Sequence, residues 1–135
     1  MVCIYCDSRT HVVNSRPKKR SNSIWRRRVC VICEAVFTSS EQVAYDSLLV
    51  VQSTASHIVP FQRDLLFLSI YDACRHRKTA TADATALTDT VLGTLLSLGK
   101  NQGILKRNDI VQTANRVLGN FDKAACVHYL AFHPL

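Results

Sequence analysis

The sequence predicts an α+β protein in which a small metal-stabilised β unit precedes a β-hairpin and a helical bundle. Three observations support this order. Two Cys-x-x-Cys pairs lie close to the N-terminus. Short runs rich in β-branched residues, which are typical of strands, alternate with turn residues up to about residue 61. Beyond that point, apolar residues recur at the three- and four-residue spacing of amphipathic helices.

The charge of the chain is concentrated near its N-terminus. The formal net charge is +7 over 135 residues. Residues 1–45 hold eight Lys/Arg side chains and three acids, whereas residues 46–135 hold nine and seven. We therefore expect two domains, a basic module at 1–45 and a larger domain at 46–135. A basic chain of this size favours nucleic acid as a partner, with an anionic membrane surface second.

The sequence offers no sign of membrane insertion or secretion. No apolar stretch reaches the roughly 18–20 residues that a membrane span needs. The opening residues, MVCIYCDSRT, lack the apolar core of a signal peptide. We therefore expect a cytoplasmic protein, in which cysteine serves metal or redox chemistry more often than structural disulfides.

Four of the six cysteines have metal-ligand spacing. They are Cys3, Cys6, Cys30 and Cys33. Four thiolates suit a tetrahedral Zn²⁺ with Zn–S distances of about 2.3 Å, so the spacing predicts a four-cysteine zinc ribbon holding one structural Zn²⁺. A redox dithiol is disfavoured because no βαβ pattern surrounds either pair. Ligand type alone leaves an iron–sulfur cluster open.

The other reactive residues form no catalytic set. His11 lies near the cysteine pairs and is only a weak reserve ligand. Cys74 and Cys126 fall in apolar helical patterns and are expected to be small buried hydrophobes. The chain has no Ser/His/Asp order, no paired carboxylates at a motif and no Gly-rich phosphate loop, so an enzyme is the least supported class.

Residues 1–45 predict a three-stranded ribbon. The expected strands are residues 11–15, 24–30 and 35–41. Residues 16–23, RPKKRSNS, combine turn formers with charge and are expected to form an exposed loop or hairpin tip. In a strand, Arg26 and Arg28 share one face and Arg27 points to the other. So small a module buries little surface, so zinc is expected to supply much of its folding free energy.

The second part predicts two strands and four helices. The strands are expected at 48–51 and 56–61, and the helices at 61–76, 81–99, 108–120 and 121–133, with residues 99–103 as a loop. The first helix should bury Leu66, Ile70, Ala73 and Cys74, backed by Phe67. The second should bury Ala84, Leu87, Val91, Leu95 and Leu98. Gly99 is expected to end the second helix, Asn108 or Asp109 to cap the third, and Gly119 to stop the third.

Several stretches, taken together, resemble one protein family. "CIYC", "VVNSRP", "SIWRRRVC", "VIC" and "FTSSEQV" follow the order and spacing of the NrdR transcriptional repressors of ribonucleotide reductase genes. The segments "LLVV", "PF", "ACRHR" and "FDKAACVHYLAF" are similar to the ATP-cone that follows the zinc ribbon in this family. The resemblance covers nearly the whole chain and is more specific in the ribbon than in the cone.

The resemblance implies a bacterial regulator. Members of the family bind pairs of short DNA boxes upstream of ribonucleotide reductase operons. ATP and dATP in the cone change the oligomeric state and hence the affinity for DNA. For this chain it implies double-stranded DNA as the partner, ATP or dATP as the effector, and a homo-oligomer, because paired sites are matched by paired modules.

The DNA-binding candidates lie in and beside the arginine run of the ribbon. They are Arg16, Lys18, Lys19, Arg20, Trp25, Arg26, Arg27 and Arg28. DNA phosphates neutralise such cations, and an arginine can also reach guanine O6 and N7. Trp25 either packs on the ribbon or stacks against sugar or base. The alternative is a solvated basic face that only keeps the protein soluble.

The chain departs from the family pattern where phosphate groups would bind. Trp25 replaces the first of four family arginines. Gln52 replaces a family lysine, and the stretch that follows, STASHIV, has no charged residue. Cys126 and His128 replace a tyrosine and an arginine. Phosphates need cationic donors or helix N-termini. The nucleotide-binding candidates are Gln52, at the position of the family lysine, and the cluster His76, Arg77 and Lys78. For this cluster the alternative is a solvated helix end.

Three functions follow, in decreasing order of support. The first is a zinc-ribbon DNA-binding repressor with ATP/dATP sensing through a diverged cone. The second keeps the DNA binding but uses the cone only for oligomerisation. The third is a protein-interaction adaptor whose ribbon contacts a partner such as RNA polymerase.

Overall fold

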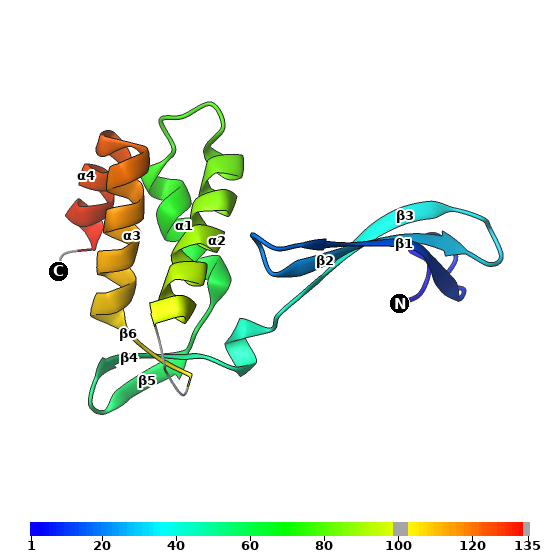
Figure 1. Cartoon of the computed structure of the whole chain (residues 1–135), viewed down its shortest axis with the longest axis horizontal. Coiled ribbons are helices and arrows are strands. Elements are labelled where there is room, and N and C mark those ends of the chain that lie inside the picture. Colours follow the sequence, from blue (N-terminus) through cyan, green and yellow to red (C-terminus); the bar gives the residue numbers. More distant parts are fainter. Residues whose placement is uncertain (99–102, 134–135) are drawn as a thin grey trace. The chain divides into compact units, whose positions relative to one another are not determined.

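The computed structural model describes residues 1–98 and 103–133. It divides into two compact units, Met1–Val43 and Ala44–Leu135, which we call the ribbon and the C-terminal unit (Figure 1). The predicted α+β class is confirmed, with strands in the ribbon and a small sheet with four α-helices in the C-terminal unit. None of the helices in the described part of the chain combines the length and apolar character that a bilayer span requires.

The ribbon is an antiparallel sheet in the order β1-β2-β3. Its strands are β1 (Thr10–Lys18), β2 (Ser23–Cys30) and β3 (Val36–Gln42). The prediction of a loop at 16–23 is wrong for its first three residues and its last, because β1 continues to Lys18 and β2 begins at Ser23. Pro17 does not stop β1, since β1 is an edge strand and needs no amide donor on its outer side. The turn is therefore confined to residues 19–22.

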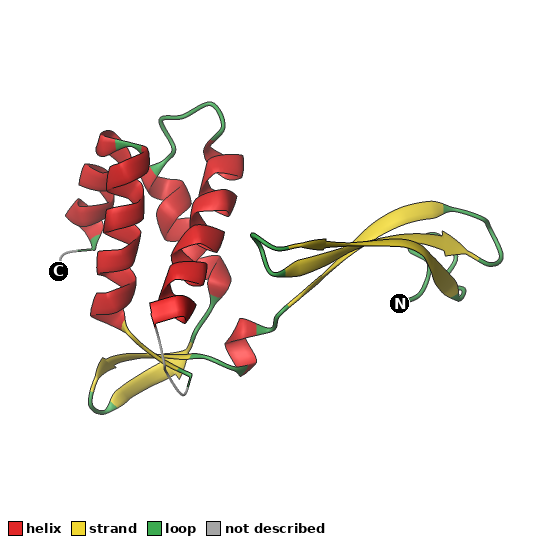
Figure 2. Ribbon diagram, viewed as in Figure 1, coloured by secondary structure: helices red, strands yellow, loops and turns green. Residues whose placement is uncertain are grey.

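The C-terminal unit begins with a short 3-10 helix, η1 (Tyr45–Ser47), and a small mixed sheet in the order β5-β4-β6 (Figure 2). Strands β4 (Val50–Thr54) and β5 (His57–Pro60) form the predicted hairpin, although β4 starts two residues later than expected. Strand β6 (Ile104–Lys106) pairs in parallel with β4 and was not predicted. A three-residue strand has too few positions for its alternation to be recognised from sequence.

The described part of this unit also contains four α-helices. They are α1 (Arg63–Ala73), α2 (Ala80–Leu98), α3 (Arg107–Phe121) and α4 (Lys123–Phe132). The helices pack on one another, and α3 packs against β4 and β6. Their buried side chains form one core with Leu49, Phe61 and Leu105 from the sheet region. Helix α4 begins at a side-chain cap, because Asp122 Oδ1 accepts hydrogen bonds from the backbone amides of Ala124 and Ala125.

The predicted helix faces are largely confirmed. Leu66, Ile70, Ala73 and Cys74 are buried, as are Ala84, Leu87, Val91 and Leu95. Leu98 is an exception at 67% exposure, because it is the last residue of α2 and lies beyond the packed part of the stripe. The predicted cap at Gly99 and most of the loop after it lie outside the described residues.

The start and end of α3 also differ from expectation. The helix begins at Arg107, with Lys106 rather than Asn108 or Asp109 at the cap position. The chain passes directly from β6 into α3, so there is no separate turn in which a capping side chain could be placed. Gly119 does not end the helix, which continues to Phe121.

Candidate metal centre and nucleic-acid interface

The two Cys-x-x-Cys pairs converge at one end of the ribbon. The sulfur atoms of Cys3, Cys6, Cys30 and Cys33 all lie within 4.8 Å of one another. The Cys3–Cys33, Cys6–Cys30 and Cys6–Cys33 Sγ distances are 3.6, 3.5 and 3.4 Å. A tetrahedral Zn²⁺ with Zn–S bonds of about 2.3 Å has sulfurs about 3.8 Å apart. The four-thiol set therefore fits one Zn²⁺.

The backbone around each pair is shaped for metal binding. Amide groups point at the ligand sulfurs, with Tyr5 N donating to Cys3 Sγ at 3.5 Å and Ile32 N to Cys30 Sγ at 3.4 Å. The residue after each pair, Asp7 or Glu34, has a positive φ, of 55° and 58° respectively. Two chain segments thus repeat the same tight turn, although neither uses glycine, and this repetition is evidence of a constrained site rather than four unrelated thiols.

The local electrostatics favour a thiolate at one ligand. Hydrogen bonds from the Ser8 side chain and then the Ser8 backbone lower the pKa of the Cys6 thiol to about 6. Thiolates are the form that binds zinc. Within the described residues the ligand group consists of the four cysteines alone, so the reserve ligand His11 is not part of it. Cys74 is fully buried and Cys126 half-buried, both in the C-terminal unit.

The arginine run occupies the central strand, β2, and strand alternation divides it. Arg26 and Arg28 lie on one face, as predicted, and reach toward β3 on that face. Arg26 Nη2 lies 2.9 Å from Glu41 Oε2, and Arg28 Nε donates to Ser39 Oγ at 2.9 Å. We call this face the paired face.

The opposite face, which we call the open face, carries Arg27. The register places Arg16 across from Trp25, and Lys18 across from Ser23. Because residues two apart on a strand share a face, Arg16, Lys18, Trp25 and Arg27 lie together. Arg16, Lys18 and Arg27 are exposed and Trp25 is half-buried. Lys19 and Arg20 are exposed in the turn that joins β1 to β2.

Gln52 lines a cavity in the C-terminal unit. The cavity has a volume of about 380 Å³ and is lined by Gln52, Ser53, Thr54, Ala55, Lys106, Arg107 and Asn108. Parallel pairing places Gln52 beside Lys106. Lys106 and Arg107 are the functional candidates that sequence reasoning missed, because their proximity to Gln52 depends on the unpredicted strand β6.

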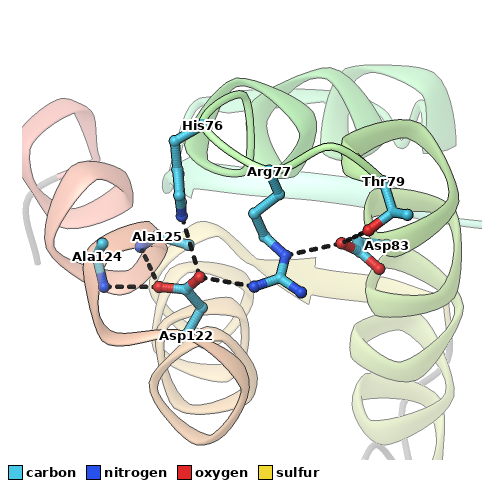
Figure 3. A network of polar contacts seen from close by, with 7 residues as sticks. All are labelled: His76, Arg77, Thr79, Asp83, Asp122, Ala124 and Ala125. Atoms are coloured by element: carbon cyan, nitrogen blue, oxygen red, sulfur yellow. Dashed lines mark hydrogen bonds and ion pairs between the residues drawn. The ribbon is translucent and has the colours of Figure 1, made fainter.

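His76 and Arg77 belong to a different part of the unit, the loop between α1 and α2 (Figure 3). Arg77 Nε donates to Asp83 Oδ2 at 2.8 Å, and its Nη1 donates to Asp122 Oδ2 at 3.0 Å. The guanidinium also lies 4.6 Å from the centre of the Phe121 ring. His76 Nε2 contacts the same Asp122 oxygen at 3.0 Å.

These contacts have clear electrostatic consequences. His76, together with the α4 amides and Arg77, holds the pKa of Asp122 well below its usual range. Arg77 likewise lowers the pKa of Asp83, and the two carboxylates raise the pKa of Arg77. The cluster therefore ties the α1–α2 loop to the start of α2 and to the cap of α4.

The nucleotide-binding candidates are not brought together. Gln52 lies in the sheet at one end of the helices, and the loop that carries His76, Arg77 and Lys78 lies at the other end (Figure 1). Lys78 is exposed. Of the predicted set, Gln52 alone lines the cavity beside Lys106 and Arg107.

Comparison with known proteins gives concordant matches. Residues 1–41 match a family described as the N-terminal domain of transcriptional repressor NrdR-like proteins. The chain is 34% identical over 134 residues to the transcriptional repressor NrdR of Chelativorans sp. (strain BNC1), covering 98% of this chain and 85% of the relative. The chain is 32% identical over 134 residues to the transcriptional repressor NrdR of Rhodospirillum centenum, again covering 98% of this chain and 85% of the relative. It is 38% identical over 103 residues to the NrdR of Azorhizobium caulinodans, covering 76% of this chain and 59% of the relative.

Proposed function

Because this chain belongs to the NrdR family of transcriptional repressors, we propose that it represses transcription by binding double-stranded DNA through its zinc ribbon. The observation that carries the proposal is the exposed cluster of cations on a sheet anchored by the four cysteines. Phosphate neutralisation by such cations supplies essentially all of the non-specific affinity of DNA-binding proteins and a large share of their specific affinity. The protein is a cytoplasmic regulator rather than an enzyme.

The metal has a structural role in this proposal. Zn²⁺ supplies the cross-link between the two cysteine pairs, held by Cys3, Cys6, Cys30 and Cys33. The ribbon has only three strands and little core of its own, so it depends on this cross-link to keep the arginine-bearing strand in place.

We further propose the regulated genes and the effector by analogy with the family. The targets are the ribonucleotide reductase genes, and ATP or dATP binds to the C-terminal unit, an ATP-cone, and changes how copies of the chain assemble. A cavity of about 380 Å³ beside Gln52 supports this part, since ligand sites span about 300–1,000 Å³. Lys106 and Arg107 offer the cationic groups that phosphates need and that Gln52 lacks.

A second function is favoured by a specific observation. Arg77 and His76 are engaged by Asp83 and Asp122, and Gln52 is uncharged. A cone with these features could serve only for oligomerisation, with DNA binding indifferent to nucleotide.

The test is a titration of the zinc-loaded chain onto a labelled duplex from a ribonucleotide reductase promoter of the source genome. A scrambled duplex of equal length is the control. Each titration is run without nucleotide, with ATP and with dATP. We expect a preference for the promoter duplex that changes with the nucleotide.

The other outcomes select other functions. Promoter preference that is indifferent to both nucleotides would favour the oligomerisation module. Equal binding to both duplexes would contradict sequence-specific repression and favour the protein-interaction adaptor.

A further inference from the structure

The two faces of the ribbon sheet differ in charge balance. The strand register assigns Arg26, Arg28, Ser39 and Glu41 to the paired face. It assigns Arg16, Lys18, Trp25 and Arg27 to the open face. Both faces carry cations, so the arginine run alone does not tell which face approaches DNA.

The paired face is poorly suited to phosphate. Its one acid, Glu41, is 63% exposed and lies 2.9 Å from Arg26, whose side chain is 29% exposed. An exposed ion pair is worth little in stability. The Glu41 carboxylate, however, repels a phosphate that approaches the Arg26 guanidinium, because like charges at close range repel each other. Arg28 is additionally engaged by Ser39.

The open face has the opposite properties. Within the three described strands it carries no acidic residue, and in the described part of the chain Arg16, Lys18 and Arg27 form no ion pair. Diagonal neighbours on adjacent strands lie about 7–8 Å apart, which places Arg16 near Arg27. Their positive charges therefore add without local compensation.

Trp25 lies in the middle of the open face. It is opposite Arg16 on β1 and opposite Ser40 on β3, and it is two residues from Arg27. The residue is half-buried, so part of its surface remains accessible beside the cations of this face. An aromatic ring in this position can contact sugar or base while the cations hold phosphates.

We propose that DNA is contacted through the open face, by Arg16, Lys18 and Arg27 with Trp25 between them, and that Arg26 and Arg28 are instead engaged by Glu41 and Ser39 of β3. This inference rests on the proposed DNA binding. It gives neighbouring arginines different functions, although nothing in the arginine run itself distinguishes them.

The salt dependence of binding separates the two faces. The logarithm of the binding constant K falls as log salt rises, and each phosphate contact steepens this fall by about 0.9. The slope below means the magnitude of this fall. We expect Arg27→Gln to reduce the slope by about 0.9 on the promoter duplex, and Lys18→Gln to reduce it by a similar amount. The matched control is Arg26→Gln, which removes the same charge from the next residue of the same strand and should leave the slope unchanged.

Two further substitutions test the assignment by other routes. Trp25→Arg adds a cation to the open face and should increase the slope by about 0.9. Glu41→Gln removes the partner of Arg26 and changes the net charge by the same amount, but should leave the slope as it is. Zinc content of one per chain and an unchanged β-sheet signal verify that each variant is folded.

The outcomes keep the two proposals separate. If the zinc-loaded wild-type chain binds neither duplex, the proposed function fails. If the wild type binds DNA but Arg26→Gln lowers the slope as much as Arg27→Gln, or Arg27→Gln leaves it unchanged, the assignment of the open face is wrong and the DNA-binding function stands. A higher slope for Glu41→Gln would likewise show that Arg26 reaches DNA.

Discussion

The substitution Gly103→Ala should destabilise the C-terminal unit strongly. Gly103 has φ of 82°, and a Cβ built on it would lie 2.7 Å from the Leu48 carbonyl oxygen. Its own carbonyl accepts a hydrogen bond from Val50 N at 2.8 Å, immediately before β6 pairs with β4. Any movement that relieves the clash therefore disturbs that pairing.

The loss of stability follows from the positive φ of Gly103 and from the short distance between a built Cβ and the Leu48 carbonyl oxygen. A non-glycine residue in the left-handed region costs about 1–3 kcal/mol. The contact at 2.7 Å is with backbone rather than with a flexible side chain, so the chain must shift and the total should reach about 2–4 kcal/mol. For a unit of this size, that corresponds to a fall in melting temperature of about 10–25 °C.

The control is another glycine in the same unit. Gly93 lies within α2 and has nothing within 4 Å of a built Cβ, so Gly93→Ala should stabilise the unit by about 0.5–1 kcal/mol. The described α-helices all belong to the C-terminal unit, and therefore the helical circular dichroism signal follows its unfolding. Trp25, the only tryptophan, reports on the ribbon.

The two glycines must respond in opposite directions if the reasoning is correct. A Gly103→Ala variant that unfolds within about 0.5 kcal/mol of the wild type would refute it. Such a result would mean that β6 does not pair with β4 as described. Lys106 would then not lie beside Gln52, and the cavity that both residues line would not form.

Three further predictions concern the zinc site, the α4 cap and the cavity. Removing zinc with a chelator should unfold the ribbon and release one metal per chain while the helical signal persists, as Trp25 fluorescence and a colorimetric zinc assay would show; simultaneous loss of both signals would contradict independent units. Asp122→Ala should lower the melting temperature by several degrees and Asp122→Asn by less, because asparagine keeps the cap but loses the ion pair. Since the pKa of Asp122 is lowered on folding, the ionised carboxylate stabilises the folded unit above about pH 5, and this stabilisation is lost as the pH falls below the ordinary carboxyl pKa near 4. The loss of stability in acid should therefore be smaller in Asp122→Asn. If the stability of Asp122→Asn depended on pH as that of the wild type does, the Asp122 cluster would be excluded as the source of the acid sensitivity. Lys106→Gln with Arg107→Gln should weaken ATP and dATP binding at least tenfold in calorimetry without lowering the melting temperature, whereas equal loss from Arg77→Gln would point to the other end of the unit.

The zinc site could be predicted because its information is local. Two Cys-x-x-Cys pairs on a short chain leave few alternatives for four thiols, and a hairpin brings the pairs together without help from the rest of the protein. The helix faces were predictable for the same reason, since Leu66 and Ile70 are one turn apart on a single helix.

Contacts between distant segments could not be predicted in this way. The parallel pairing of Gln52 with Lys106 joins residues from two different parts of the chain, and its short strand has no pattern of its own. Asp122 was likewise unremarkable in sequence, yet it caps α4 and binds both His76 and Arg77. In each case the function of the residue depends on a neighbour that only the fold provides.

The fold also explains how the ribbon tolerates three consecutive arginines. Adjacent like charges repel most when their side chains run side by side, but a strand directs successive side chains to opposite faces. Only Arg26 and Arg28 share a face, and there Glu41 and Ser39 on β3 engage them. Arg27 is left without such a partner among the described residues, together with Arg16 and Lys18. The uncompensated charge of the ribbon is therefore concentrated on one surface, where a polyanion gains the most from neutralising it.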